Sequence, residues 1–159
     1  MPSKKYPLEP VARVRAIRAD DATREVADAI RAREVAEKRL RAAEREGEKA
    51  RATAQGMRDA EQGALERGEL RAGDLMRADA WEARAKEDLA QLERQLEHAR
   101  AREAEALAKE SAAKHELAQR SADARVVEAD RARWTDQERR KQDAREEEAG
   151  AEAWRPKRA

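Results

Sequence analysis

The chain has 159 residues; 45% are charged and 3% are aromatic, and its 36 basic residues nearly balance 35 acidic ones. Ordinary soluble domains carry about 25% charged residues, and much of the 40% hydrophobic share here is alanine, which supplies little area for a thick core. These values exclude a Rossmann domain, a β-sandwich and a TIM barrel, argue against strong nonspecific binding to nucleic acid, and leave extended helix or disorder.

The distribution of proline favours helix over disorder. The four prolines lie at positions 2, 7, 10 and 156, so residues 11–155 contain none. Ala, Arg, Glu, Leu and Lys, all strong helix formers, dominate this stretch. Acidic residues four positions before basic ones, as in Glu34–Lys38 and Glu105–Lys109, support exposed helix faces.

Clustered glycines divide the helical pattern in two. Four of the six glycines lie within residues 56–73, and each costs a helix about 0.5–1 kcal/mol relative to alanine. Gly73 and Asp74 form an N-cap candidate, and the stretch from Asp79 to Glu82 resembles a second helix start. We therefore predict an N-terminal extension at 1–10, a single coiled-coil hairpin at 11–149 and a C-terminal tail at 150–159. Within the hairpin we predict a first helix at about 11–65, a turn near 66–73 and a second helix at about 74–149.

Small and apolar residues spaced three and four apart predict a coiled-coil seam along both helices. The seam is regular in the first helix, where Arg33 is its one charged member, and its phase slips in the second helix near Leu107. A short glycine-rich connection favours an antiparallel partner within one chain. The fold predicted is all-α, an elongated antiparallel two-helix coiled coil; a parallel homodimer of near-continuous helices is the rival. The predicted seam comprises Val26, Ala29, Ala36, Leu40, Ala43, Ala50, Ala54, Met57, Leu89, Leu92, Leu96, Leu117, Val127 and Trp134.

Two regions are candidate docking surfaces. Leu75, Met76 and Trp81 follow the turn and either close the hairpin or form an apolar knob for a partner protein. The other region combines two basic stretches, near each end of the chain, which a hairpin places at one end. It is either a docking plug or the solvated end of a coiled coil, and its members are Leu8, Val11, Arg13, Val14, Arg15, Arg18, Arg139, Arg140 and Lys141.

The sequence contains no catalytic constellation. His98 and His115 lie outside any metal-binding spacing, and cysteine is absent. Neither a P-loop nor a dinucleotide-binding glycine motif occurs. We therefore expect no enzymatic activity, no metal and no cofactor. We also expect no secretory signal and no direct membrane insertion, because no window approaches ~18 apolar residues.

The N-terminal sequence Tyr6-Pro7-Leu8-x-Pro10-Val11-x-x-Val14-Arg15-x-x-Arg18-x-Asp20-Asp21-Ala22 resembles the opening of type III secretion stalk proteins of the YscO/FliJ type. The resemblance continues through the glycine-bearing break, the start of the second helix at Asp74 and Leu75, and an acidic then basic tail.

This resemblance implies a function. Members are antiparallel coiled coils that sit in the pore of a hexameric secretion ATPase through the end carrying both termini, contact the membrane-embedded export gate and escort export chaperones. By resemblance, the basic region faces the ATPase ring, and Leu75, Met76 and Trp81 contact the gate or a chaperone. The resemblance also implies the bacterial cytoplasm, peripheral to the inner-membrane secretion apparatus. We expect a monomer when free; a homodimeric scaffold and a holdase-type chaperone are the alternatives.

Overall fold

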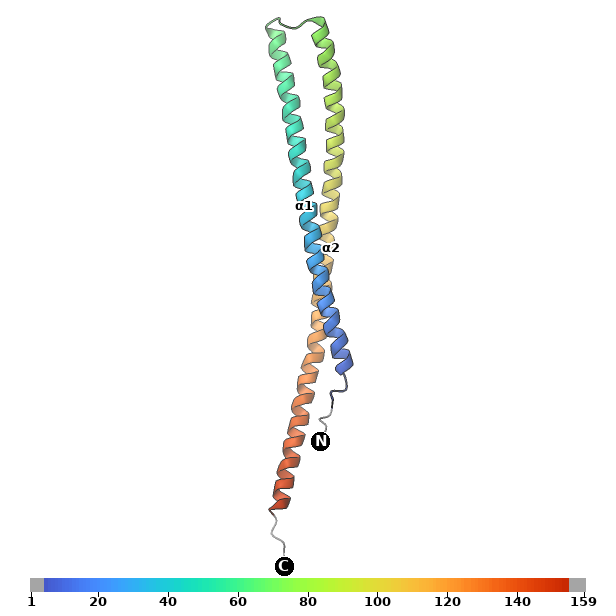
Figure 1. The fold of residues 1–159 in the computed structure, drawn as a ribbon, viewed down its shortest axis with the longest axis vertical. Coiled ribbons are helices and arrows are strands. Elements are labelled where there is room, and N and C mark those ends of the chain that lie inside the picture. Colours follow the sequence, from blue (N-terminus) through green and yellow to red (C-terminus); the bar gives the residue numbers. More distant parts are fainter. Residues whose placement is uncertain (1–4, 155–159) are drawn as a thin grey trace, which may run out of the picture. The chain divides into compact units, whose positions relative to one another are not determined.

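The computed structural model describes residues 5–154. Two helices, α1 (Glu9–Glu66) and α2 (Ala72–Ala153), account for nearly all of them, and the described residues include no strand (Figure 1). The chain divides into two units: unit 1 comprises residues 1–26 and 112–159, and unit 2 comprises residues 27–111. Each unit therefore contains one segment of α1 and one segment of α2.

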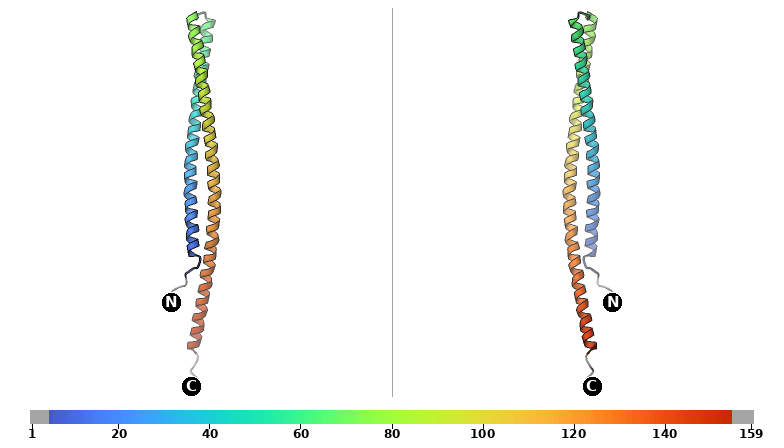
Figure 2. Two further views of the ribbon diagram at one scale, coloured as in Figure 1. Left: turned by 90° about the vertical axis from the view of Figure 1, so that its right-hand side faces the viewer. Right: turned by 90° about the vertical axis from the view of Figure 1, so that its left-hand side faces the viewer.

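The helices run antiparallel within each unit, as Figures 1 and 2 show. In unit 2, Arg33 forms an ion pair with Glu110, and Arg58 forms one with Glu82. The paired residues are closer together in sequence nearer the turn, as antiparallel helices require. In unit 1, Glu9 of α1 pairs with Arg131 of α2. The predicted all-α, two-helix hairpin is confirmed.

A Schellman motif ends α1. Gly68 has a φ of 69°, a left-handed conformation that glycine adopts without steric cost. Its amide donates to the carbonyl of Leu65 at 3.0 Å, and the Glu69 amide donates to the carbonyl of Ala64 at 3.0 Å. These two bonds satisfy carbonyls that the last helical turn leaves unpaired.

The turn is shorter than the sequence predicted. Residues 67–71 separate the helices, in place of 66–73. Gly56 and Gly63 lie inside α1, and Gly73 lies in the first turn of α2. Among the described glycines only Gly68 has a positive φ. The cluster of glycines in the sequence therefore gives the approximate position of the turn, and the backbone conformation of Gly68 gives its exact position.

The predicted N-cap of the second helix is wrong by three residues. Asp74 is the third residue of α2, and its carboxylate accepts a hydrogen bond from the Arg71 amide at 3.0 Å. This is the backward half of a capping box. The Arg71 amide and the Arg77 side chain hold the pKa of Asp74 below its usual value. The stretch from Asp79 to Glu82 lies inside the helix and starts nothing.

Both helices extend beyond their predicted outer ends. The first begins at Glu9, because Pro10 falls in the first turn, where a missing amide hydrogen costs nothing. The second continues to Ala153, so most of the predicted tail that the structure describes is helical. Residues 155–159 of that tail, and residues 1–4 of the predicted extension, lie outside the described part of the chain.

The spacing of three and four residues continues without a slip along α2. Between Leu96 and Leu117 the buried or half-buried positions include Ala99, Glu103 and Glu110, whereas Leu107 is exposed. The expected phase slip is therefore wrong, because charged and small residues, rather than leucines, occupy the seam there.

The core is thin. The buried hydrophobic residues in the described chain are six, and no side chain is fully buried. Most of the predicted seam residues are half-buried, while Ala54, Leu96 and Val127 are buried. Met57 keeps the spacing but is exposed, unlike the other predicted seam residues.

Candidate protein-interaction surfaces

In unit 1, an aromatic cluster packs the segment that precedes α1 against α2. The Tyr6 side chain is 7% exposed and packs with Ala12, Val127 and Trp134. Its ring centroid lies 5.7 Å from that of Trp134, and its hydroxyl donates to Asp130 Oδ2 at 2.5 Å. That hydrogen bond, with partial burial, raises the pKa of Tyr6 to about 12. In the sequence Tyr6 is visible only as part of the N-terminal motif, and its packing role is not.

The basic residues at the start of α1 differ in how they are held. The Arg15 guanidinium is half-buried and donates to the Asp123 carbonyl of α2 at 3.1 Å. Arg13 and Arg18 are exposed and form no ion pair with any residue that the structure describes. Arg15 therefore supports the pairing of the helices, whereas Arg13 and Arg18 are available to a partner.

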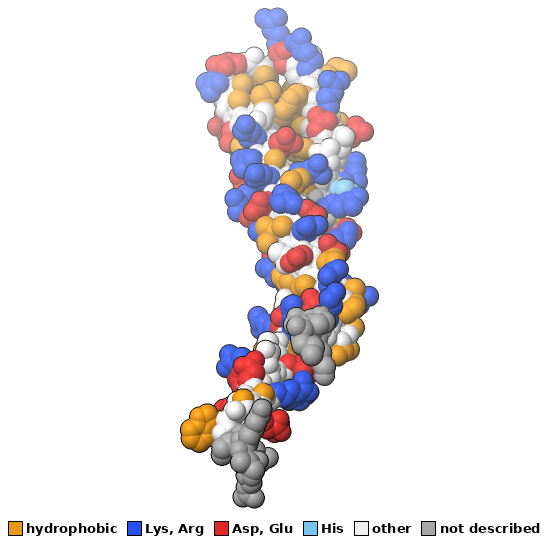
Figure 3. All heavy atoms as spheres, turned by 60° about the horizontal axis from the view of Figure 1, so that its bottom comes forward, with side chains coloured by type: hydrophobic (Ala, Val, Ile, Leu, Met, Phe, Trp, Pro, Cys, Tyr) orange, Lys and Arg blue, Asp and Glu red, His pale blue; other side chains and the backbone are white. Residues whose placement is uncertain are grey.

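Apolar side chains accompany these arginines. Leu8, Val11, Val14 and Ile17 are all exposed large hydrophobic residues. Isolated exposed apolar residues need no explanation, but four within ten consecutive positions give the outer side of this stretch an apolar character that suits a protein partner. We call Leu8, Val11, Val14 and Ile17, with Arg13 and Arg18, the N-terminal patch. Figure 3 shows acidic and basic side chains interspersed along the face that it presents.

The second basic stretch lies at a different level of unit 1. Arg139, Arg140 and Lys141 are exposed, and Lys141 pairs with Glu138 at 2.8 Å. Arg15 lies opposite Asp123, so Arg139 is about 24 Å farther along α2 at ~1.5 Å per residue. Both stretches lie in unit 1, where Glu9 pairs with Arg131, but the overhang of α2 beyond the start of α1 spaces Arg139, Arg140 and Lys141 along the helix away from the arginines of α1.

The residues that follow the turn differ in exposure. Met76 is 75% exposed and Leu75 is also exposed, whereas Trp81 is half-buried. Trp81 is predicted either to close the hairpin or to bind a partner, and its partial burial agrees with both roles. Met76 is the residue of this group that offers most of its surface.

A charged network within the seam of unit 2 went unrecognised in the sequence. Arg33 Nε lies 2.6 Å from Glu110 Oε2, and Arg33 Nη1 lies 3.1 Å from Glu37 Oε2. Glu110 is 8% exposed, and its carboxylate raises the pKa of Arg33 above the usual value. The signal was Arg33 itself: a lone arginine on a seam needs a carboxylate from the opposite helix.

The described residues contain no group of three or more His, Cys, Asp or Glu side chains that could hold a metal ion. No helix in that part of the chain is long and apolar enough to cross a membrane.

Comparison with known proteins identifies the family. The family model described as YscO-like protein matches residues 3–153. The chain belongs to the YscO-like family. It is therefore related to type III secretion, and its family is a non-enzymatic one of that system.

A solved structure shares the fold of this YscO-like protein. It is the structure of a putative YscO homolog, CT670 from Chlamydia trachomatis. The two chains share 23% sequence identity and superpose with a TM-score of 0.79, and the match covers 94% of this chain and 91% of that one. A search of the curated proteins finds no significant match. The stated resemblance to the YscO type is thus confirmed by the family and the fold.

Proposed function

We propose that this YscO-like protein is a stalk and adaptor of a type III secretion ATPase, held by the hexameric ring through unit 1 and contacting the export gate and export chaperones elsewhere. It acts on the cytoplasmic side of the inner membrane and performs no chemistry itself. The observation that carries the proposal is the N-terminal patch of a YscO-like two-helix hairpin, in which exposed apolar residues lie beside arginines without ion pairs.

The patch suits a ring partner for a physical reason. Apolar contacts supply affinity when they leave water, and uncommitted cations steer an acidic surface into place. Tyr6 and Arg15 tie this part of α1 to α2, so the patch is presented on a supported helix. A stalk needs this support to transmit the asymmetry of a ring.

Charge reversal at Arg13 and Arg18 tests the proposal. The variant Arg13→Glu/Arg18→Glu should weaken binding to the purified cognate ATPase about tenfold or more at low salt, and less as salt rises. Arg15 is excluded because its loss breaks the bond to Asp123. Affinity is measured by fluorescence anisotropy, and stimulation of ATP hydrolysis is measured in parallel.

A matched variant controls for net charge. Arg45 and Lys49 are exposed on the same helix but belong to unit 2, so Arg45→Glu/Lys49→Glu should bind as the unaltered chain does. If the unaltered chain neither binds nor stimulates the ATPase, the stalk proposal is wrong. Equal weakening by both variants would assign binding to net charge rather than to the patch.

Leu75 and Met76 belong to the gate and chaperone side of the proposal. Leu75→Ser/Met76→Ser removes exposed apolar area beyond the Schellman turn and should reduce gate or chaperone binding while ATPase binding persists. Pull-down with the purified export gate domain and with each cognate export chaperone separates the two roles. Retained binding to both would remove this group from the interface.

A further inference from the structure

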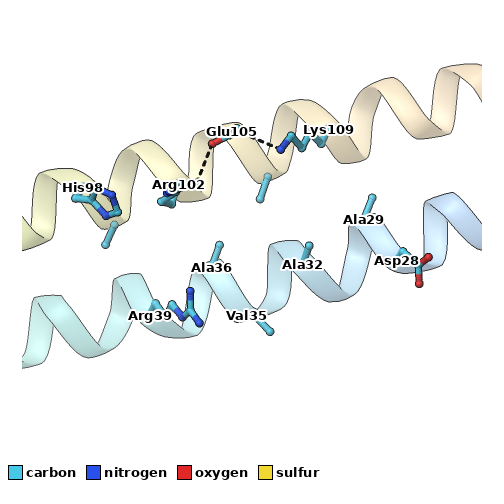
Figure 4. Close-up of a pocket in the computed structure, with 12 residues that line it drawn as sticks. Asp28, Ala29, Ala32, Val35, Ala36, Arg39, His98, Arg102, Glu105 and Lys109 are labelled. Carbon is cyan, nitrogen blue, oxygen red and sulfur yellow. Dashed lines mark ion pairs between the residues drawn. The ribbon is translucent and has the colours of Figure 1, made fainter.

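A groove of about 670 Å³ lies between the helices of unit 2 (Figure 4). Its lining residues span 28–39 on α1 and 98–109 on α2, a length of about 16 Å at ~1.5 Å per residue. Figure 4 shows Ala29, Ala32 and Ala36 pointing toward α2. Alanine side chains on both walls let another helix approach closely.

The rim of the groove carries an excess of positive charge. Three basic side chains line it against two acidic ones, and one carboxylate, Glu105, is shared by Lys109 at 2.8 Å and Arg102 at 3.6 Å, which leaves that cluster with a net positive charge. Asp28 pairs with Arg31 on its own helix. Arg39 makes no ion pair within the described chain. The groove therefore suits a narrow helix flanked by carboxylates.

The end of α2 has that chemistry. Residues 143–153, which we call the acidic segment, are all exposed and contain five carboxylates against one arginine. Ala144 and Ala151 are seven residues apart and so share one face of the helix. The carboxylates that flank this face are Glu148 and Glu152 on one side and Asp143 and Glu147 on the other.

We propose that the acidic segment of one copy of this chain docks in the groove of a second copy. The segment is about 15 Å long at ~1.5 Å per residue, close to the length of the groove. Its Ala144–Ala151 face meets the alanine floor, and its flanking carboxylates meet Arg39, Arg102 and Lys109. A chain cannot fill its own groove, because α2 is unbroken from Ala72 to Ala153 and contains both surfaces.

The contact is reciprocal when the two α2 helices pair antiparallel. Each copy then offers its segment to the groove of the other, which gives a closed two-fold arrangement. Each contact is made by a segment of only eleven residues, and complexes with small interfaces are typically weak. The dimer is therefore expected in concentrated solution, and the free monomer expected from the sequence is its dilute form.

Sedimentation equilibrium of the full chain tests the proposal. At low salt and rising concentration the mass should move from 18.0 kDa toward twice that value. Glu148→Lys/Glu152→Lys should weaken self-association about tenfold or more, as should Arg39→Glu/Arg102→Glu in the groove. Glu44→Lys/Glu48→Lys, on exposed positions outside both surfaces, is the matched control and should change little.

Mixing the two charge-reversed variants gives the decisive result. The reversed segment of one then meets the reversed groove of the other, and the second contact of the pair keeps its original charges. The mixture should dimerise although neither variant does so alone. Circular dichroism of each variant checks that the helices remain folded.

Cysteine cross-linking places the contact independently, since the chain has no cysteine of its own. Ala99→Cys/Ala151→Cys should form disulfide-linked dimers on mild oxidation with copper phenanthroline, because an antiparallel segment brings Ala151 level with Ala99 of the groove lining. Ala99→Cys/Ala149→Cys, with its second cysteine on the far side of the segment, should not. A monomer at all concentrations, a dimer that ignores both reversals, or equal cross-linking of the two pairs would overturn the proposal. None of these results bears on binding to the ATPase.

Discussion

Replacing Gly68 with alanine is expected to lower the free energy of unfolding by about 1 kcal/mol. Gly68 has a φ of 69°, and the left-handed region costs a residue with a side chain about 1–2 kcal/mol. Alanine also has less conformational entropy than glycine in the unfolded chain, which offsets about 0.4–1 kcal/mol of that cost. No heavy atom lies within 4 Å of a Cβ placed there, so steric contact adds nothing and the backbone conformation decides the result.

Gly56→Ala is the matched substitution and should have the opposite effect. Gly56 lies inside α1 with open space around its Cβ position. Alanine there should raise the free energy of unfolding by about 0.5–1 kcal/mol, because glycine weakens a helix interior. Both variants add one methyl group in open space, so a difference in sign isolates the backbone conformation.

Urea unfolding followed by circular dichroism measures both changes. Thermal unfolding provides a second readout, with about 2–4 °C expected for each kcal/mol in a chain of this size. Stabilisation by Gly68→Ala equal to that of Gly56→Ala would refute the Schellman turn as described. The hairpin would then turn at another residue.

Three further predictions concern the two units. Val127→Ala should lower the free energy of unfolding by about 1.5 kcal/mol in urea titrations, since a buried branched side chain is lost from the cluster around Tyr6; an unchanged midpoint would contradict that packing. Because the pKa of Tyr6 is raised from 10.0 to about 12, its contribution to stability is complete below pH 10 and is lost as pH rises toward 12. Tyr6→Phe should lack this dependence in unfolding measured across that range, and identical profiles would contradict the assignment. Either Arg33→Leu or Glu110→Leu alone should lower the melting temperature, whereas the double substitution should recover it or exceed it; additive losses would show that the pair is not coupled.

The sequence was sufficient for the fold because helix propensity and spacing act locally. The absence of proline from residues 11–155 and the alternating steps of three and four are both visible without a partner helix. The turn was less accessible, since four clustered glycines look alike in sequence and only Gly68 adopts a positive φ. Asp74 was recognised as a capping residue but assigned to the wrong position, because an aspartate can cap forward from the N-cap or backward from the third residue.

Contacts between distant residues were the least predictable part. Glu110 lies 77 residues from Arg33, and pairing them requires the register of the hairpin. The same register sets the spacing between Arg15, which lies opposite Asp123, and Arg139, about 24 Å farther along α2. Candidate surfaces could thus be found from composition. Only the structure shows that Arg15 bonds to the opposite helix, whereas Arg13 and Arg18 make no ion pair in the described chain.

Site-specific photo-cross-linking to the ATPase distinguishes binding through unit 1 from binding through unit 2. Val14 in unit 1 and Val35 in unit 2 are 47% and 49% exposed, so a photoreactive amino acid at either position meets solvent equally. With the purified cognate hexamer, we expect cross-links from position 14 and few from position 35. Cross-links from position 35 with none from position 14 would contradict the proposal that unit 1 is held by the ring.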